Sequence, residues 1–144
     1  MKLTATPLRP GELAGLAEAL DVANLPNADL ADPGHLFFRF KADGFIGYGG
    51  LQGGGGADRL LRSIVVLPDR RGHGLGQALV ATLEQQARHL RVQRLHLLTT
   101  TAAPFFRTLG YADTDRGAAP PAIAASREFA ALCPASAAYL VKAL

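Results

Sequence analysis

Residues 64–77 read IVVLPDRRGHGLGQ and contain the most informative pattern in the chain. The β-branched residues at its start predict a buried strand over Leu60–Leu67. Leucines at helical spacing predict an amphipathic helix over Gly74–Leu90. Three glycines, at positions 72, 74 and 76, lie in the turn between them, where the first N–H groups of the helix have no intrahelical partners. Because glycine lets a bulky anion approach those groups, the turn is a candidate site for phosphate or pyrophosphate.

Arg70 and Arg71 add positive charge to this turn. Two common phosphate-binding motifs do not fit it. A Walker A loop needs a Gly-Lys pair, which the sequence lacks, and the dinucleotide motif GxGxxG fails because Gln77 stands in place of its third glycine. A glycine turn that serves only tight packing is the alternative to an anion site.

The rest of the chain alternates between strand-like and helix-like segments. Asp43-Gly44 separates two strand-like runs and predicts an antiparallel hairpin in the first half. The order of elements predicts a mixed α/β fold. Further strands are expected over Leu3–Leu8, Leu36–Lys41, Phe45–Leu51, Leu95–Thr100, Tyr111–Asp115 and Ala137–Val141, and further helices over residues 13–20 and 104–109. The Ala/Pro-rich segment before the last strand has no periodicity that assigns it.

Length and composition set the class of protein. A chain of 144 residues with 49% hydrophobic and 19% charged residues predicts a single globular domain over residues 1–144 and argues against disorder. No apolar run approaches the roughly 20 residues of a membrane span, and the N-terminus has no apolar signal core, so we expect a cytoplasmic protein. Cys133 is the only cysteine, which excludes an intramolecular disulfide and a multi-cysteine zinc site. It lies between Leu132 and Pro134, and because a nucleophile would need a histidine partner, we expect a buried thiol instead.

The basic residues are mostly arginine. Twelve of the fifteen basic residues are Arg, and the formal net charge is +3. The arginine fork suits phosphate and carboxylate, so the excess indicates an anionic partner. The scarcity of aromatic residues argues against nucleic acid as that partner. The four histidines show no metal-ligand spacing, so no metal is expected.

Two motifs resemble those of a known family. Arg71-x-x-Gly74-x-Gly76, after a strand that ends in Val66, resembles the acetyl-CoA motif of the GCN5-related N-acetyltransferases, the GNAT superfamily. The run FFRTLGY over residues 105–111 resembles that family's second landmark. A narrower resemblance, to small N-acetyltransferases of arsenic-resistance operons, rests on LRS at 61–63, LTTTA at 98–102, REFA at 127–130 and LCPAS at 132–136.

The resemblance implies the GNAT fold, a mostly antiparallel mixed sheet with flanking helices, and acetyl-CoA as cosubstrate. The backbone of the strand would pair with pantetheine, and the N–H of Val66 would stabilise the oxyanion. A primary amine of a small molecule, amino-acid-like or organoarsenical, would accept the acetyl group, and a homodimer is expected. The implied cofactor-binding residues are Ile64, Val65, Val66, Arg71, Gly72, His73, Gly74, Leu75, Gly76, Gln77, Thr99 and Phe106.

One departure from the family concerns Phe106. Many members carry a tyrosine there that protonates the departing thiolate, which phenylalanine cannot do. CoA thiolate can leave without full protonation, because a thiol pKa is already about 8.5. The alternative function is a non-catalytic acyl-CoA-binding sensor or scaffold.

Two further residues are candidates on the substrate side. Arg62 is a candidate fork for a substrate carboxylate, or else a strand residue that reaches solvent or pairs with Asp58. Ser63 is expected on the opposite face of the strand. Glu128 is a candidate base or amine anchor, or else a solvated surface residue.

Overall fold

The structure, a computed structural model, describes residues 3–53, 56–72, 74–132 and 136–144. Seven strands form one sheet in the order β1-β2-β3-β4-β5-β7-β6. Neighbouring strands are antiparallel except β4 and β5, which are parallel. The strands are β1 Thr4–Pro7, β2 His35–Lys41, β3 Phe45–Gln52, β4 Asp58–Val66, β5 Arg94–Thr99, β6 Ala112–Asp113 and β7 Ala138–Ala143. The mixed, mostly antiparallel sheet expected from the sequence is therefore confirmed.

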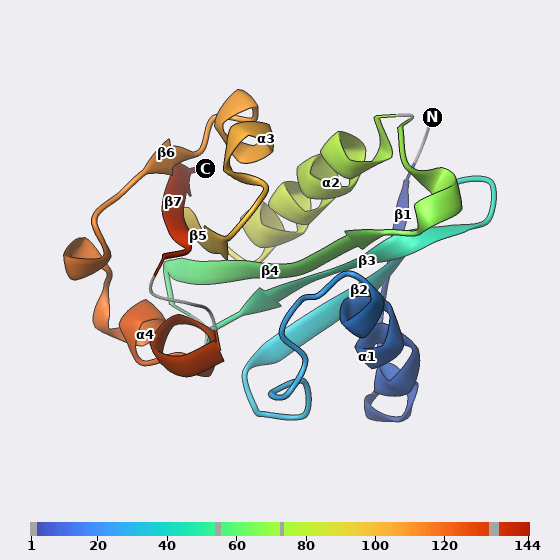
Figure 1. Cartoon of the computed structure of the whole chain (residues 1–144), viewed down its shortest axis with the longest axis horizontal. Coiled ribbons are helices and arrows are strands. Elements are labelled where there is room, and N and C mark those ends of the chain that lie inside the picture. Colours follow the sequence, from blue (N-terminus) through green and yellow to red (C-terminus); the bar gives the residue numbers. More distant parts are fainter. Residues whose placement is uncertain (1–2, 54–55, 73, 133–135) are drawn as a thin grey trace.

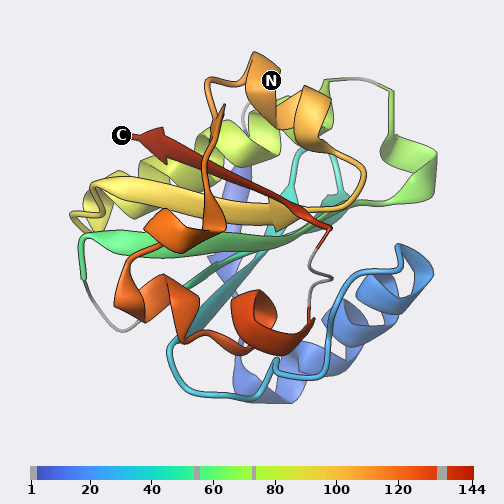
Figure 2. The ribbon, with the colours of Figure 1, turned by 60° about the vertical axis from the view of Figure 1, so that its left-hand side comes forward.

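Helices cover both faces of this sheet. Figure 1 shows α2 and α3 on one face and α1 and α4 on the other, and the turned view in Figure 2 agrees. The α-helices are α1 Leu13–Val22, α2 Leu75–His89, α3 Ala103–Thr108 and α4 Pro121–Ala124. A single π-helical turn, Glu128–Leu132, follows α4. Within the described ranges, no helix is long and apolar enough to cross a bilayer.

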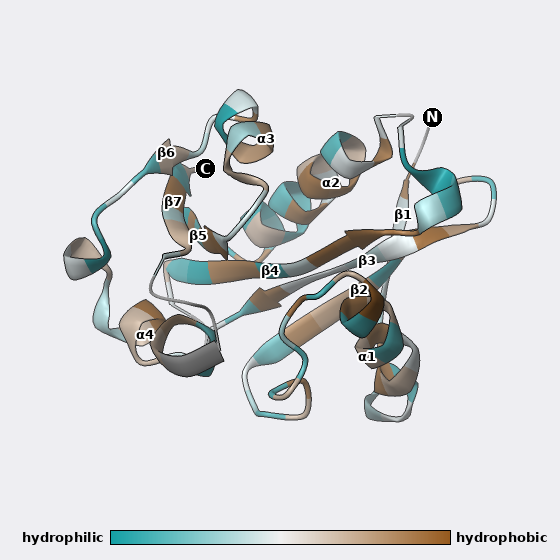
Figure 3. Cartoon of the chain, viewed as in Figure 1, coloured by the Kyte–Doolittle hydropathy of each residue, from teal (hydrophilic) through white to brown (hydrophobic). Residues whose placement is uncertain are grey.

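Strand alternation divides the core into two parts. Phe38 and Leu51 pack with Leu79 and Leu83 of α2, whereas Phe37, on the other face of β2, joins a second cluster against α1. Both faces of the central strands are therefore buried, which explains the hydrophobic colouring of much of β4 in Figure 3.

The parallel strands β4 and β5 are joined along only part of their length. Their ladder pairs Asp58 with Arg94, Arg59 with Leu95 and Leu60 with His96. Residues 61–66 continue along β3, while β5 continues along β7 as far as Thr99. The two strands therefore separate toward their C-terminal ends.

The predicted elements are observed with small changes in their bounds. The strand expected over Tyr111–Asp115 is only the two residues of β6. The unassigned Ala/Pro-rich segment contains α4 and the π-helical turn. This segment lies over the same face of the sheet as α1 (Figures 1 and 2).

Candidate active site

A cleft of about 1060 Å³ occupies the gap between β4 and β5. Besides Glu128, its walls come from four parts of the fold: the loop that follows α1, the separated strands, the glycine turn with the start of α2, and α3 with the turn before it. Glu128 adds a wall from the π-helical turn. The lining residues are 23–26, 61–66, 71–72, 74–77, 97–102, 105–106 and 128. Every predicted site residue within the described ranges lines this one cleft, and His73 lies outside those ranges.

The glycine turn has the open backbone that an anion site requires. Gly72 and Gly74 have φ of +85° and +71°, a region that favours glycine, and a Cβ added to either would meet no described atom within 4 Å. The helix α2 begins directly after Gly74. Its first N–H groups lack intrahelical partners and lie at the positive end of the helix dipole. The turn therefore presents backbone N–H donors beside open space that can accommodate an anion.

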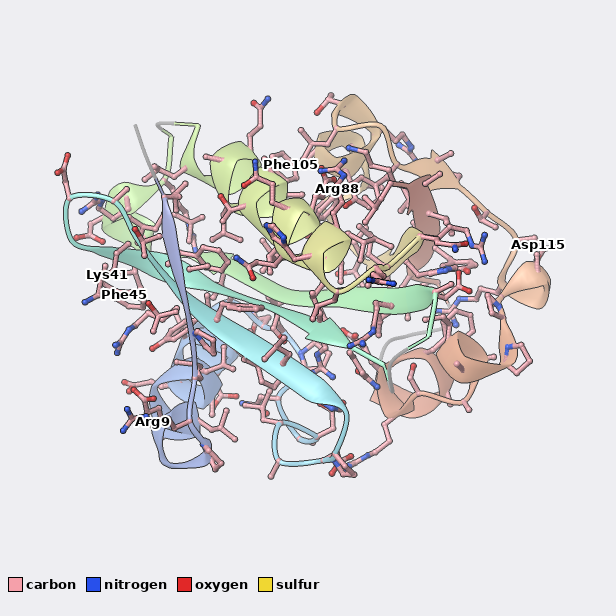
Figure 4. The ribbon with its side chains drawn as sticks, turned by 180° about the vertical axis from the view of Figure 1, so that it is seen from behind. Arg9, Lys41, Phe45, Arg88, Phe105 and Asp115 are labelled. Carbon is pink, nitrogen blue, oxygen red and sulfur yellow. The ribbon has the colours of Figure 1, made fainter. Side chains whose placement is uncertain are left out.

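The helix α3 packs across the first turn of α2. A Cβ at Gly76 would lie 3.5 Å from the ring of Phe105, which Figure 4 labels in the view from behind. Phe106 is buried and stacks edge-to-face with Phe105 and Tyr111, at centroid distances of 5.1 and 5.5 Å. Its ring is thus a fixed apolar wall, with no hydroxyl to offer a departing thiolate.

The two arginines of the turn have different roles. Arg71 lines the cleft and donates from Nε to the carbonyl of Val66, at 2.9 Å. Arg70 donates instead to the carbonyls of Ala42 and Asp43, at 2.7 and 3.0 Å. Both arginines carry charge close to the turn, as expected, but Arg70 does not line the cleft, because the β2–β3 hairpin holds its guanidinium.

The opposite end of the cleft holds a buried ion pair. The Arg62 guanidinium makes a two-pronged contact with Asp29, with 2.7 Å between Nη2 and Oδ1, and both side chains are fully buried. The fork considered for a substrate carboxylate is occupied by Asp29 in this structure. Pairing of Arg62 with Asp58, the alternative, was wrong, because Asp58 binds Arg94 and His96.

Ser63 departs from the expected alternation. Its φ is +58°, and the pairing register between β3 and β4 shifts at this point. The resulting bulge brings Ser63 to the cleft together with Arg62, and the Arg62 Nε donates to its hydroxyl at 3.1 Å. The prediction that Ser63 lies on the opposite face is therefore wrong.

Glu128 enters the cleft from the π-helical turn. It is only 6% exposed, so it is not a solvated surface residue, and its Oε2 lies 3.8 Å from the Arg62 Nε. Thr99, on the β5 side, accepts a hydrogen bond from the Ala102 N–H at 2.9 Å and shapes the turn into α3. These positions bring the predicted substrate-side and cofactor-side residues into one cavity.

Asp29 was not predicted from the sequence. It lies in the irregular loop between α1 and β2, and its partner Arg62 is 33 positions away, so no local spacing indicated the pair. Burial alone would raise the pKa of Asp29. Hydrogen bonds to His35 and Arg62, together with the charge of Arg62, outweigh burial and hold that pKa well below its usual range.

A second buried polar group lies at the other end of β4 and β5. His96 contacts Asp58 and the Tyr139 hydroxyl, each at 2.7 Å, and stacks on the Tyr139 ring. His96 is therefore a packed core residue. Within the described residues, no cluster of histidine and acidic side chains could hold a metal ion. Cys133 lies outside the described residues.

Comparison with known proteins identifies the family. The model of the acetyltransferase (GNAT) domain matches residues 32–113, more than half of the chain. The chain belongs to the GNAT acetyltransferase family. The match includes β2 to α3, and with them the glycine turn and both separated strands of the GNAT fold. Comparison with curated proteins finds no match.

Solved GNAT structures resemble the chain over nearly its full length. N-acetylglutamate synthase from Neisseria gonorrhoeae, crystallised with coenzyme A and L-arginine, has a TM-score of 0.75 at 18% identity, and the match covers 99% of this chain and 33% of the synthase. A Mycobacterium tuberculosis protein crystallised with CoA has a TM-score of 0.75 at 20% identity over 98% of this chain and 99% of its own. A GNAT acetyltransferase from Staphylococcus aureus has a TM-score of 0.74 at 14% identity over 99% of each chain. The chain spans about a third of the synthase, and likeness at these identities shows the fold alone.

Proposed function

We propose that this protein transfers the acetyl group of acetyl-CoA to a primary amine of a small molecule. The observation that carries the proposal is the single cleft that runs from the glycine turn to Glu128 between the separated strands. Family membership and the CoA bound in structural relatives support acetyl-CoA as the cosubstrate. Sequence resemblance to arsenic-resistance enzymes supports organoarsenical amines as acceptors to test.

The cofactor-binding roles follow from the two backbone segments that line the cleft. Backbone N–H groups from Gly72 to Gln77 would hold the pyrophosphate at the positive end of the α2 dipole. Ile64, Val65 and Val66 would present strand backbone to the pantetheine arm. Arg71, which bonds the Val66 carbonyl, would hold the turn against the strand and add charge near the phosphates.

The acceptor amine must lose a proton before it attacks. Glu128 would accept that proton, directly or through a water molecule. The amine nitrogen then forms a bond to the acetyl carbon, the Val66 N–H stabilises the oxyanion, and the carbon–sulfur bond breaks with its electron pair left on sulfur. Phe106 cannot protonate this thiolate, so it would leave as the anion or take a proton from water.

Acetyl-CoA binding is tested at the glycine turn. Gly72→Asp puts a carboxylate where the structure is open and should raise the Kd for CoA at least tenfold by repulsion of phosphate. Aspartate tolerates positive φ better than most residues, which limits the loss of stability. Gly11→Asp, an open position on the 3-10 turn before α1, is the matched control. Calorimetric titration with CoA measures both variants, and unchanged affinity in Gly72→Asp would contradict a pyrophosphate site there.

Catalysis is tested at Glu128. Glu128→Gln should lower kcat on any accepted amine on the order of 100-fold while the Kd for CoA stays unchanged, since a lost general base slows only the chemical step. Glu18→Gln, on the exposed face of α1, is the control. Release of free CoA with a panel of amines measures turnover. CoA binding without turnover on any amine would favour the sensor or scaffold function instead.

A further inference from the structure

The Arg62–Asp29 pair lies beside Glu128 at the end of the cleft opposite the glycine turn. We call this the acceptor end, because the proposed acceptor amine would bind there. Besides Asp29, the Arg62 guanidinium donates from Nη1 to Gln52 Oε1 at 2.9 Å and from Nε to Ser63 Oγ at 3.1 Å. His35 Nε2 lies 3.2 Å from Asp29 Oδ2 and 3.1 Å from Arg62 Nη1. Groups from the α1–β2 loop, β2, β3 and β4 thus converge on one guanidinium. Its donors are directed at the protein.

Two carboxylates face the Arg62 guanidinium. Asp29 remains ionised because its pKa is lowered, so its carboxylate compensates the charge of Arg62. Glu128 then adds a second carboxylate, 3.8 Å from the Arg62 Nε. Both carboxylates therefore lie within 4 Å of this guanidinium, and Asp29 occupies its two-pronged face.

The remaining cation of the cleft lies elsewhere. Among the described lining residues, Arg71 is the other cationic side chain, and it belongs to the glycine turn. The strand rise of about 3.3 Å per residue puts Arg62 roughly 13 Å along β4 from Val66, to which Arg71 is bonded. A carboxylate on the acceptor would thus find the fork of Arg62 already taken by Asp29 and a second carboxylate, Glu128, beside it, whereas an amine would find Glu128 as a binding partner.

We propose that Asp29 determines acceptor specificity: by occupying the fork of Arg62 it withholds that fork from a substrate carboxylate and selects amines that carry no carboxylate, a role that rests on the acetyl transfer proposed above. An arginine in the floor of an amine site would otherwise suit the carboxylate of an amino acid. By pairing with Arg62, Asp29 removes the attraction that such acceptors would otherwise gain, which is the discrimination that specificity against them requires. The apolar walls from Leu25, Pro26 and Leu98 would accommodate a neutral or apolar remainder of the amine.

The first test needs only the wild-type protein. Alanine, leucine and phenylalanine are each compared with their primary amides as acceptors, by mass spectrometry of the acetylated product. Rates are expressed per concentration of unprotonated amine, because the amide group lowers the amine pKa. We expect kcat/KM at least tenfold higher for the amides. Equal or better use of the free acids would overturn the proposal, and so would acetylation of none of the amides. If no amide is acetylated but CoA is released with another amine, the specificity proposal fails while the proposed acetyl transfer stands.

Variants at the ion pair test the cause of the preference. Asp29→Asn should lower the amide-to-acid ratio of kcat/KM at least tenfold, since a substrate carboxylate can then compete for Arg62. The double variant Asp29→Asn, Arg62→Gln removes both charges of the pair together and should keep the preference for amides, because no guanidinium fork is then available to a substrate carboxylate. Loss of activity on the acids alone in this double variant would show that Arg62 binds their carboxylate, and would overturn the proposal.

Asp113→Asn is the matched control. Asp113 makes the same two-pronged contact with an arginine, Arg107, at 2.7 and 2.9 Å, but the pair is exposed on the surface. The amide-to-acid ratio should not change in this variant. An equal change in Asp113→Asn and Asp29→Asn would overturn the assignment of specificity to Asp29.

Discussion

Ser63 bends β4 at the point where the cleft begins. Its φ of +58° lies in the left-handed region, which costs an ordinary residue roughly 1 kcal/mol and a β-branched residue more. We expect Ser63→Val to lower the free energy of unfolding by more than about 1 kcal/mol, while Ser63→Gly, which relieves the strain, stays near wild type. Urea denaturation measures both variants. Equal losses would contradict strain as the cause and would indicate that the hydroxyl contact with Arg62 dominates.

Single residues also mark the limit of what the sequence could predict about the site. The lining by residues 64–66 and by the glycine turn was predictable, because it follows from a strand, a turn and a helix that are consecutive in the chain. The bulge at Ser63 could not be predicted, because strict strand alternation assigns the Ser63 side chain to the face opposite Arg62. The partner of Arg62 could not be predicted either, because Asp29 lies in a loop without a periodic pattern and reaches Arg62 only through tertiary packing.

The pairing of β3 with β4 depends on a close approach of two backbones. A Cβ at Gly47 would lie 2.0 Å from the Val65 carbonyl oxygen, and a backbone atom cannot move away as a flexible side chain could. We therefore expect Gly47→Ala to cost about 3 kcal/mol or more, or to prevent folding, and to disturb the strand that lines the cleft. Gly11→Ala, where a Cβ meets no described atom within 4 Å, should stay within about 0.5 kcal/mol of wild type. Thermal denaturation compares the two, and similar melting temperatures would contradict the clash.

Elements with a strong period were predicted well. Leu75, Leu79 and Leu83 define the buried face of α2, and the alternating or continuous apolar runs define β2 to β5. The segment that carries Glu128 was not assigned, because α4 has four residues and the π-helical turn five, too short for a periodic signal. The segment that carries Glu128 is thus stabilised by tertiary contacts, and its own sequence has no periodic helix signal.

The arginine excess is distributed over the whole molecule rather than gathered at one site. Arg94, Arg107 and Arg127 each pair with an aspartate at the surface, at 2.7, 2.7 and 2.8 Å. Figure 4 shows Arg9 and Arg88 on separate parts of the structure. The net charge of +3 therefore says less about ligands than the two arginines of the cleft do. One of these, Arg62, also connects the α1–β2 loop with β2, β3 and β4 through its side-chain contacts.

The resistance of the fold to acid should depend on the Arg62–Asp29 ion pair. The lowered pKa of Asp29 favours its ionised form in the folded state, so its contribution to stability is complete above the unfolded pKa of about 3.8 and is lost as the pH falls below it. Asp58 acts in the same direction, because the hydrogen bond from Arg94 lowers its pKa despite burial.

We expect the unfolding free energy of the wild type to fall most steeply below about pH 4, between the unfolded pKa of Asp29 and its much lower folded pKa. In Asp29→Asn the slope should be shallower by up to about 1.4 kcal/mol per pH unit, the value for one proton. Asp113→Asn, at an exposed pair, should keep nearly the wild-type slope, because exposed ion pairs contribute little. Urea denaturation at several pH values measures all three proteins. An unchanged slope in Asp29→Asn would show that protonation of Asp29 does not drive unfolding, and that the loop, β2, β3 and β4 are held together by packing alone.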